Sequence, residues 1–291
     1  MGVRPLVIGH DDPVLRDHLA DRAAFLSLAG AGYAAEEVVH LLAPGDVLVS
    51  DHPGLDGEAR LAVALTGARH VVVDDFGGPG PWPCDVVVNP NLGAGSVSYP
   101  QAGRTLAGPR FALLREAVRR AAGRGRDPVA PVRRIVVSLG GSDLGARARV
   151  LLETIAPRGD DGLEVVATLP AGGLPAGVEA APRSELPELL AWADMAILSG
   201  GVLKYEAAAC GLPALLVAVV EHQVEVARRF AATGAARYLG RLDRLSAFAV
   251  GTAVARLRRD ADTRLRMRTV GRRLVDGRGV QRIADAVLSS R

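Results

Sequence analysis

Short apolar runs alternate along the chain with longer stretches in which apolar residues recur every three to four positions. A short run rich in β-branched residues is typical of a buried strand, and the wider spacing is typical of a helix with one buried face. The alternation predicts an α/β fold, with parallel strands joined by crossover helices. The expected strands are residues 5–8, 47–50, 70–73, 86–88, 135–139, 164–168, 195–198 and 214–219.

Helices are expected in the intervening stretches, and one break in the pattern divides the chain. The helical stretches are residues 13–28, 55–65, 115–122, 146–155, 185–192, 204–210 and 223–233, with two or more helices from 246 onward. Glycine, proline and charge cluster without apolar spacing in the sequence GRGRDPVAP at 123–131. Such a cluster indicates a linker. We therefore expect two domains, residues 1–126 and 127–291.

Composition excludes several classes of protein. With 49% hydrophobic and 23% charged residues over 291 positions, the chain is globular rather than disordered or fibrous. Apolar stretches such as 213–220 are much shorter than the roughly 20 residues of a membrane-spanning helix. The first residues hold too short an apolar run for a secretory signal, which predicts a cytoplasmic protein. Two cysteines, Cys84 and Cys210, are too few for a disulfide framework or a four-ligand zinc site.

The charge pattern gives little reason to expect a nucleic-acid partner. The net charge is +3, basic and acidic residues are interleaved, and aromatic residues make up only 4% of the chain. Few aromatic side chains means little surface on which bases stack. Among 35 basic residues, however, Lys204 is the only lysine. Where arginine is the default cation, a single lysine becomes a candidate for a specific role.

Two strand ends carry candidate ligand-binding turns. The strand at 135–139 leads directly into Gly140, Gly141 and Ser142, and the strand at 195–198 leads into Ser199-Gly200-Gly201. In open parallel sheets ligands bind beyond the carboxyl ends of strands, and glycine allows the backbone to approach them. For the first turn, an ordinary tight connection is the alternative.

The second turn opens a helix that contains Lys204 and Glu206. Free backbone N–H groups and the helix dipole at such a turn suit a phosphate group. We interpret Lys204 as a cation facing a diphosphate and Glu206 as an acceptor for ribose hydroxyl groups. The alternatives are an exposed lysine and a solvated helix carboxylate.

These segments resemble the GT-B glycosyltransferase superfamily, and within it the nucleotide-sugar hydrolase of pseudaminic acid biosynthesis and its spore-coat polysaccharide relatives. The resemblance begins near Asp46 and continues to the C-terminus. It is carried by VSLGGSD (137–143), ADMAILSGGVLKYEAAACGLPALLV (193–217), EHQ (221–223), VDGRG (275–279), VDD (73–75), CDVVVNPNLGA (84–94), Tyr99 and LAGPRFALLREAV (106–118).

The resemblance implies two Rossmann-like domains whose parallel sheets face a cleft, with a UDP-sugar held mainly by the C-terminal domain. No metal and no cofactor are expected, because backbone amides and helix dipoles stabilise the leaving diphosphate in this fold. His222 and Gln223 are expected near the sugar, with a helix cap and a surface residue as their alternative readings. The expected substrate-binding residues are Gly140, Gly141, Ser142, Ser199, Gly200, Gly201, Val202, Lys204, Glu206, His222, Gln223, Asn89 and Arg115.

The N-terminus departs from the family pattern. Family members begin with a strand and a Gly-x-Gly-His-x-x-Arg turn whose histidine is implicated as the catalytic base. Here Val7 replaces the first glycine before His10, and the next arginine is Arg16. In a second alignment, residues 4–42 match the family's second βα unit and the first unit is absent. That alignment predicts a shortened N-terminal domain or a rebuilt site.

Further acid or base candidates lie just after the expected strands of the N-terminal domain. Asp51 and His52 follow one strand, and Asp74 and Asp75 follow another. A histidine with a pKa near neutrality can deprotonate water or an alcohol, with a carboxylate orienting its ring. The catalytic candidates are therefore His10, His52 and Asp51, while Asn89, Asn91 and Arg115 are expected on the acceptor side.

We predict an inverting, metal-independent enzyme that cleaves the anomeric C–O bond of a UDP-sugar. Likeness to the pseudaminic acid enzyme favours water as the acceptor, which makes the protein a nucleotide-sugar hydrolase. The first alternative is a glycosyltransferase with an organic acceptor, such as a nucleobase in the manner of cytosylglucuronic acid synthases, or a polysaccharide precursor. The second is a catalytically inactive sugar-nucleotide binding protein.

Overall fold

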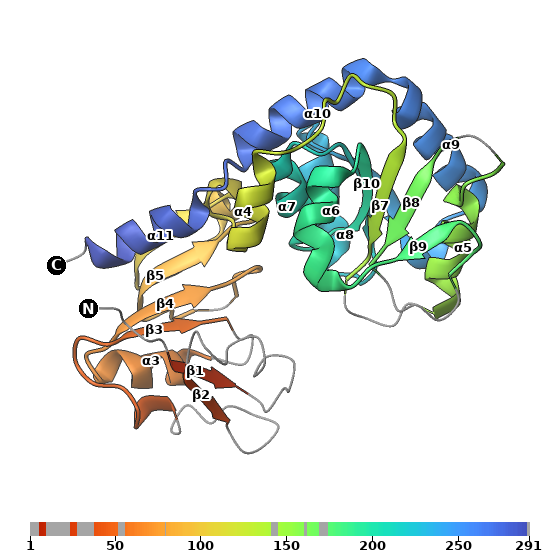
Figure 1. Ribbon diagram of the computed structural model, residues 1–291. Coiled ribbons are helices and arrows are strands. Elements are labelled where there is room, and N and C mark those ends of the chain that lie inside the picture. The colour runs from red at the N-terminus through yellow and green to blue at the C-terminus, as the bar shows by residue number, and fades with distance from the viewer. Residues whose placement is uncertain are drawn as a thin grey trace. The chain divides into compact units, whose positions relative to one another are not determined.

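The computed structural model describes residues 6–9, 24–27, 38–51, 56–78, 80–140, 145–159, 162–168 and 174–289 (Figure 1). The chain forms two compact units. Unit 1 comprises Met1–Asn89 and Ala94–Ala107, and unit 2 comprises Pro90–Gly93 and Gly108–Arg291. This division differs from the boundary expected between residues 126 and 127. The reason is helix α4 (Glu116–Ala122), whose Val118 and Ala121 are fully buried in the core of unit 2.

Unit 1 is built on two parallel sheets. Strands β1 (Leu6–Gly9) and β2 (Ala24–Ser27) pair with each other. The second sheet has the order β3 (Val47–Ser50), β4 (Arg69–Val73), β5 (Cys84–Asn89) and β6 (Ala102–Ala107). Between β3 and β4 lies helix α3 (Gly57–Leu65), which begins where the Asp56 carboxylate accepts a hydrogen bond from the Ala59 N–H. The helix expected over 13–28 is wrong at β2, and its other residues lie outside the described ranges.

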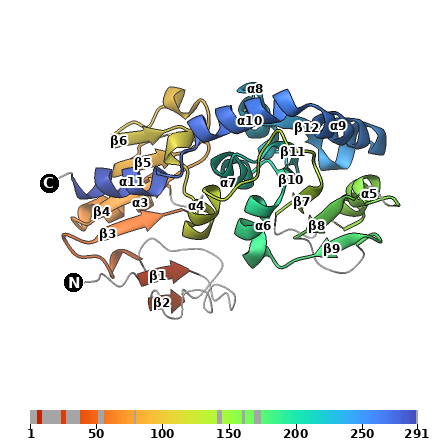
Figure 2. The same cartoon turned by 45° about the horizontal axis from the view of Figure 1, so that its top comes forward.

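Unit 2 contains one six-stranded parallel sheet in the order β12-β11-β10-β7-β8-β9, seen from two directions in Figures 1 and 2. Its strands are β7 (Arg134–Ser138), β8 (Glu164–Ala167), β9 (Val178–Ala180), β10 (Met195–Ser199), β11 (Ala214–Ala218) and β12 (Arg237–Arg241). Its helices after α4 are α5 (Gly145–Ile155), α6 (Leu186–Trp192), α7 (Leu203–Cys210), α8 (Gln223–Ala232), α9 (Ala247–Arg259), α10 (Ala261–Leu274) and α11 (Gly279–Leu288).

Alternate residues of the central strands face two separate cores, as the period of a strand requires. Val136, Leu198 and Leu216 pack in a cluster with apolar residues of α4, α6, α7 and α8. Ile135, Ile197 and Leu215 belong to a second cluster that includes apolar residues of α5 and α9. The sheet is therefore covered on both faces, which explains why its central strands are continuous apolar runs.

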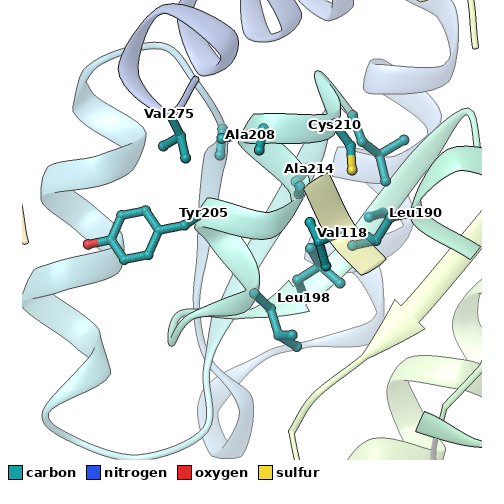
Figure 3. Close-up of a cluster of buried hydrophobic side chains, with 14 of the residues drawn as sticks. Val118, Leu190, Leu198, Tyr205, Ala208, Cys210, Ala214 and Val275 are labelled. Carbon is teal, nitrogen blue, oxygen red and sulfur yellow. The ribbon is translucent and has the colours of Figure 1, made fainter. Parts of the chain in front are cut away.

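The first of these clusters surrounds α7 (Figure 3). Every residue of this eight-residue helix is buried, including Lys204 and Glu206. Figure 3 shows the Tyr205 hydroxyl directed away from the labelled aliphatic side chains. In the described part of the chain, no helix combines the length and the apolar character that crossing a membrane requires.

Candidate functional site

The order of the six-stranded sheet reverses between β7 and β10. From β7 the chain continues through β8 to β9 on one side, and from β10 through β11 to β12 on the other. The carboxyl ends of β7 and β10 lie side by side, with Ser138 in register with Leu198. Open α/β sheets bind their ligands at such a switch point. The topology of unit 2 thus singles out the two predicted turns.

The residues after β7 and β10 lie next to each other. Gly140 has a φ of +96°, a conformation that favours glycine, and a Cβ added there would lie 3.9 Å from the Ser199 Oγ. Ser199 is buried at the end of β10. The neighbouring Gly141 and Ser142, also predicted to bind substrate, lie outside the described residues.

Two glycines carry the chain from β10 into α7. The Gly200 N–H donates to the Val217 carbonyl at 3.0 Å, which ties the turn to β11. A Cβ on Gly200 would lie 2.9 Å from the Ala227 Cβ, so α8 approaches closely only because this residue has no side chain. Val202 precedes the helix and is exposed. At the start of α7 the N–H groups of Lys204 and Tyr205 donate to the Gly201 and Val202 carbonyls at 3.4 and 2.9 Å, and the dipole of the helix favours an anion at this end.

Lys204 is only 3% exposed, so its reading as an ordinary exposed lysine is wrong. Its ammonium group donates to the Gly201 carbonyl at 3.0 Å and lies 3.9 Å from the centre of the Tyr205 ring. The Tyr205 hydroxyl in turn donates to the Asn91 Oδ1 at 2.8 Å. The positive charge therefore lies against the glycine turn.

Glu206 is also buried, and its reading as a solvated carboxylate is wrong. Arg115 donates from Nε to Oε1 and from a terminal guanidinium nitrogen to Oε2, both at 3.0 Å. An ionised carboxylate has about four acceptor positions, so two hydrogen bonds from Arg115 leave room for other donors. The structure places Arg115, which was expected on the acceptor side, against the predicted ribose acceptor within the same unit.

Gln223, the first residue of α8, reaches the same turn. Its Oε1 accepts from the Val219 N–H at 3.1 Å, and its Nε2 would lie 3.4 Å from a Cβ added to Gly201. His222 is exposed, and it precedes α8 as the N-cap residue without a side-chain capping bond. Gly140, the Ser199–Gly201 turn and Gln223 therefore converge at one edge of the sheet, and their binding of substrate stays a prediction.

The catalytic candidates belong to unit 1, and the structure describes only one of them. Asp51 is exposed just after β3, whereas His10 and His52 lie outside the described residues. Asn89 is buried and donates to the Tyr99 hydroxyl at 2.8 Å, and this hydroxyl donates to the Asp74 Oδ2 at 2.7 Å. Burial, first of several causes, raises the pKa of Tyr99 well above its usual range. Within unit 1, the Tyr99 hydroxyl therefore links Asn89, at the end of β5, to Asp74, which follows β4.

The two cysteines, Cys84 and Cys210, are buried thiols. Burial raises the pKa of the Cys210 thiol to about 12 and that of Cys84 to about 11, so both remain protonated near neutral pH. A protonated thiol is a poor nucleophile. Over the described residues, no group of three or more histidine, cysteine, aspartate or glutamate side chains is arranged to hold a metal ion.

The pairing of Arg115 with Glu206 and that of Tyr205 with Asn91 were not predicted from the sequence. The partners are separated by 91 and 114 positions. Both charged partners lie in segments that resemble the family, LAGPRFALLREAV and the stretch around α7, and this was the only sequence signal that linked them.

Comparison with known proteins supports the fold. No family model matches the chain. Over 100 residues, 34% of this chain, the sequence is 36% identical to the spore coat polysaccharide biosynthesis protein SpsG of Bacillus subtilis (strain 168). The match spans only 30% of that relative.

Solved structures match nearly the whole chain at low sequence identity. The glycotransferase of kitacinnamycin has a TM-score of 0.69 and 16% identity, covering 98% of this chain and 91% of that one. The UDP-GlcNAc 2-epimerase from Neisseria meningitidis, solved with bound UDP-GlcNAc, has a TM-score of 0.59 and 11% identity, covering 99% and 92%. With two units built on parallel sheets, these likenesses show that the chain has the GT-B fold and is related to SpsG over the matched residues.

Proposed function

We propose that unit 2 binds a UDP-sugar at the switch point between β7 and β10. The observation that carries the proposal is the convergence of Gly140, the Ser199–Gly201 turn and Gln223 at the carboxyl edge of the sheet. The diphosphate binds at the N-terminus of α7, where the helix dipole and the nearby Lys204 offset its charge. The fold is shared with an epimerase that was solved with bound UDP-GlcNAc.

The nucleotide is oriented by two further groups. Glu206 accepts hydrogen bonds from ribose hydroxyl groups, one helical step beyond the diphosphate. The sugar lies near Gln223 and the Gly140 turn. Because α7 and its turn are packed in the core of unit 2, these groups are held in place before the ligand binds, which lowers the entropy cost of binding.

The reaction that we propose is hydrolysis of the anomeric C–O bond. The oxygen of water attacks the anomeric carbon while the bond from that carbon to the diphosphate oxygen breaks, and UDP leaves with the bonding electrons. A base takes the proton of the water, and His10, His52 and Asp51 of unit 1 are the candidates. The attack inverts the anomeric carbon, and the N-terminus of α7 stabilises the leaving diphosphate without a metal ion.

Transfer to an organic acceptor is the second candidate reaction. It is favoured by the likeness of the fold to the glycotransferase of kitacinnamycin. The two reactions share the donor site and differ only in the nucleophile, so one experiment separates them.

The test has a binding step and a reaction step. UDP should bind in calorimetry, and both Glu206→Ala and Gly201→Val should weaken it, because one removes the ribose acceptor and the other places a side chain at the phosphate turn. A panel of UDP-sugars in oxygen-18 water should then yield free sugar that carries the label, with unlabelled UDP. Replacing the true base, as in His52→Gln or His10→Gln, should lower turnover by about 10²–10⁴-fold while UDP binding persists.

Three outcomes would contradict parts of the proposal. Unchanged UDP affinity in both binding variants would exclude this site. Turnover that starts only after an organic acceptor is added would favour the transferase. Intact UDP binding without turnover of any UDP-sugar, with or without acceptors, would favour a binding protein.

A further inference from the structure

Helix α7 buries a carboxylate that one arginine neutralises. The Glu206 side chain is 3% exposed, whereas that of Arg115 is 47% exposed. A buried carboxylate is costly unless it is paired and hydrogen-bonded. Among the contacts that the structure describes, Arg115 supplies both of the hydrogen bonds to the Glu206 oxygens.

The geometry of this pair fixes the direction of the carboxylate. Two parallel hydrogen bonds of 3.0 Å join the fork of the guanidinium to both carboxylate oxygens. Such a bidentate pair is more directional than a single contact, because rotation of either group breaks both bonds. Lysine carries the same charge but has no fork and would not impose this orientation.

The main chain of Arg115 is itself held rigidly against α7. Leu114 on one side, and Val118 and Ala121 of α4 on the other, are buried in the cluster that surrounds α7. The neighbouring segment is also tightly packed, since a Cβ on Gly279 would collide with the Ala112 carbonyl oxygen. The pair therefore links two elements that have fixed positions within unit 2.

We propose that Arg115 is a positioning residue that acts through Glu206 to select a ribonucleotide. It turns the carboxylate so that its remaining acceptor positions meet the 2′- and 3′-hydroxyl groups of ribose. It also neutralises the Glu206 charge, so that the diphosphate at the same helix is not repelled. This inference rests on the proposed binding of UDP at α7 and adds the residue that makes the site selective for ribose.

The experiment compares the affinities of UDP and 2′-deoxy-UDP by calorimetry. Wild-type protein should prefer UDP by about tenfold or more, the usual value of a hydrogen bond to a charged group. Arg115→Gln should reduce this preference to near unity, and Arg115→Lys should leave an intermediate preference. Both affinities come from the same preparation, so the ratio does not depend on the fraction of folded protein.

A matched control and a double variant separate positioning from other roles. Arg120 also lies on α4 and pairs with Glu116 at the surface, so Arg120→Gln should retain the full preference. In a Glu206→Ala background, which lacks the ribose acceptor, the preference should be absent already, and adding Arg115→Gln should not change the ratio further.

The outcomes distinguish this inference from the function on which it rests. A wild type that does not bind UDP would overturn both. A wild type that binds UDP but does not prefer it to the deoxy form would overturn the positioning role and leave UDP binding by unit 2 standing. The same holds if Arg115→Gln keeps the preference. It also holds if Arg115→Gln still changes the ratio in the Glu206→Ala background, since the arginine would then contact the ligand directly.

Discussion

At the scale of single residues, two adjacent glycines serve different purposes. A Cβ on Gly200 would press on the Ala227 Cβ at 2.9 Å and on the Gln223 carbonyl oxygen at 3.2 Å. Gly200→Ala should therefore lower the free energy of unfolding by about 1–3 kcal/mol, the usual cost of overpacking. A Cβ on Gly201 would lie 3.4 Å from the Gln223 Nε2, an ordinary contact. Gly201→Ala should leave stability nearly unchanged and weaken UDP binding.

Urea unfolding and calorimetry with UDP test both halves of this prediction. The two variants add the same methyl group one residue apart, so each is the control for the other. A Gly200→Ala protein as stable as wild type would contradict the close approach of α8. A Gly201→Ala protein with unchanged UDP affinity would contradict a phosphate at the turn.

Candidate site residues were predictable from the sequence where they lie close together in the chain. Lys204 and Glu206 were identified because they follow a glycine turn in the chain. The structure places Lys204 beside that turn and Glu206 one helical step beyond it. Their burial and their partners were not predictable. Both depend on α4 and on residues 90–93, which reach α7 only through tertiary packing.

At the scale of elements, the predicted strands are confirmed to within two residues. The strands that the sequence pattern did not predict lie mostly at the edges of sheets. β6 is an edge strand of the four-stranded sheet, and β9 and β12 are the two edges of the six-stranded sheet. Edge strands are only partly buried, so they lack the apolar runs that identify central strands. β12 contains Gly240 at a φ of +128°, next to a shift in its register with β11. β2 was assigned to a helix because its short run, AFLS, lies in a stretch that also fits helical spacing.

The corner between α9 and α10 depends on a buried arginine. Arg264 is 2% exposed, and its guanidinium donates to five backbone carbonyls. Two of these, of Leu257 and Arg258, lie in the last turn of α9, and the others belong to residues 128–130 before β7. Arg264, on α10, therefore links this helix to α9 and to residues 128–130, which precede β7.

Removing this guanidinium should be costly. Arg264→Met keeps much of the side-chain volume but leaves several carbonyls without a partner, which should lower the free energy of unfolding by about 3 kcal/mol. Arg273 lies on the same helix and is exposed, so Arg273→Met should change stability by less than about 0.5 kcal/mol. Equal free energies of unfolding for the two variants in urea would contradict a stabilising role for the Arg264 guanidinium.

At the scale of the whole molecule, each unit contains one of the two tryptophans. Trp82 is buried in unit 1, with the Arg60 guanidinium 4.0 Å from its ring centre and an edge-on contact to Tyr99. Trp192 ends α6 in unit 2. The variants Trp192→Phe and Trp82→Phe therefore allow the fluorescence of one tryptophan to report on unit 1 or on unit 2.

Mild acid should destabilise unit 1 through His70. This ring is fully buried beside Ser50, with 2.8 Å between its Nε2 and the Ser50 Oγ. Burial, aided by the charge of Arg60, lowers the pKa of His70 from 6.5 to about 4. Between these pH values the unfolded chain binds a proton that the folded unit excludes, so stability falls as pH decreases. From pH 7 to 4.5 the expected loss is about 2 kcal/mol.

The measurement is urea unfolding at the two pH values, followed by each tryptophan separately. The transition that Trp82 reports should move to lower urea at pH 4.5, and His70→Gln should make it less sensitive to pH. In unit 2, hydrogen bonds from Arg282 hold the pKa of Asp276 at about 2, so the stability that this ion pair contributes is lost only below pH 4, outside the window. The transition that Trp192 reports should therefore shift less. A Trp82 transition that does not move, or that moves equally in His70→Gln, would show that folding does not lower the pKa of His70.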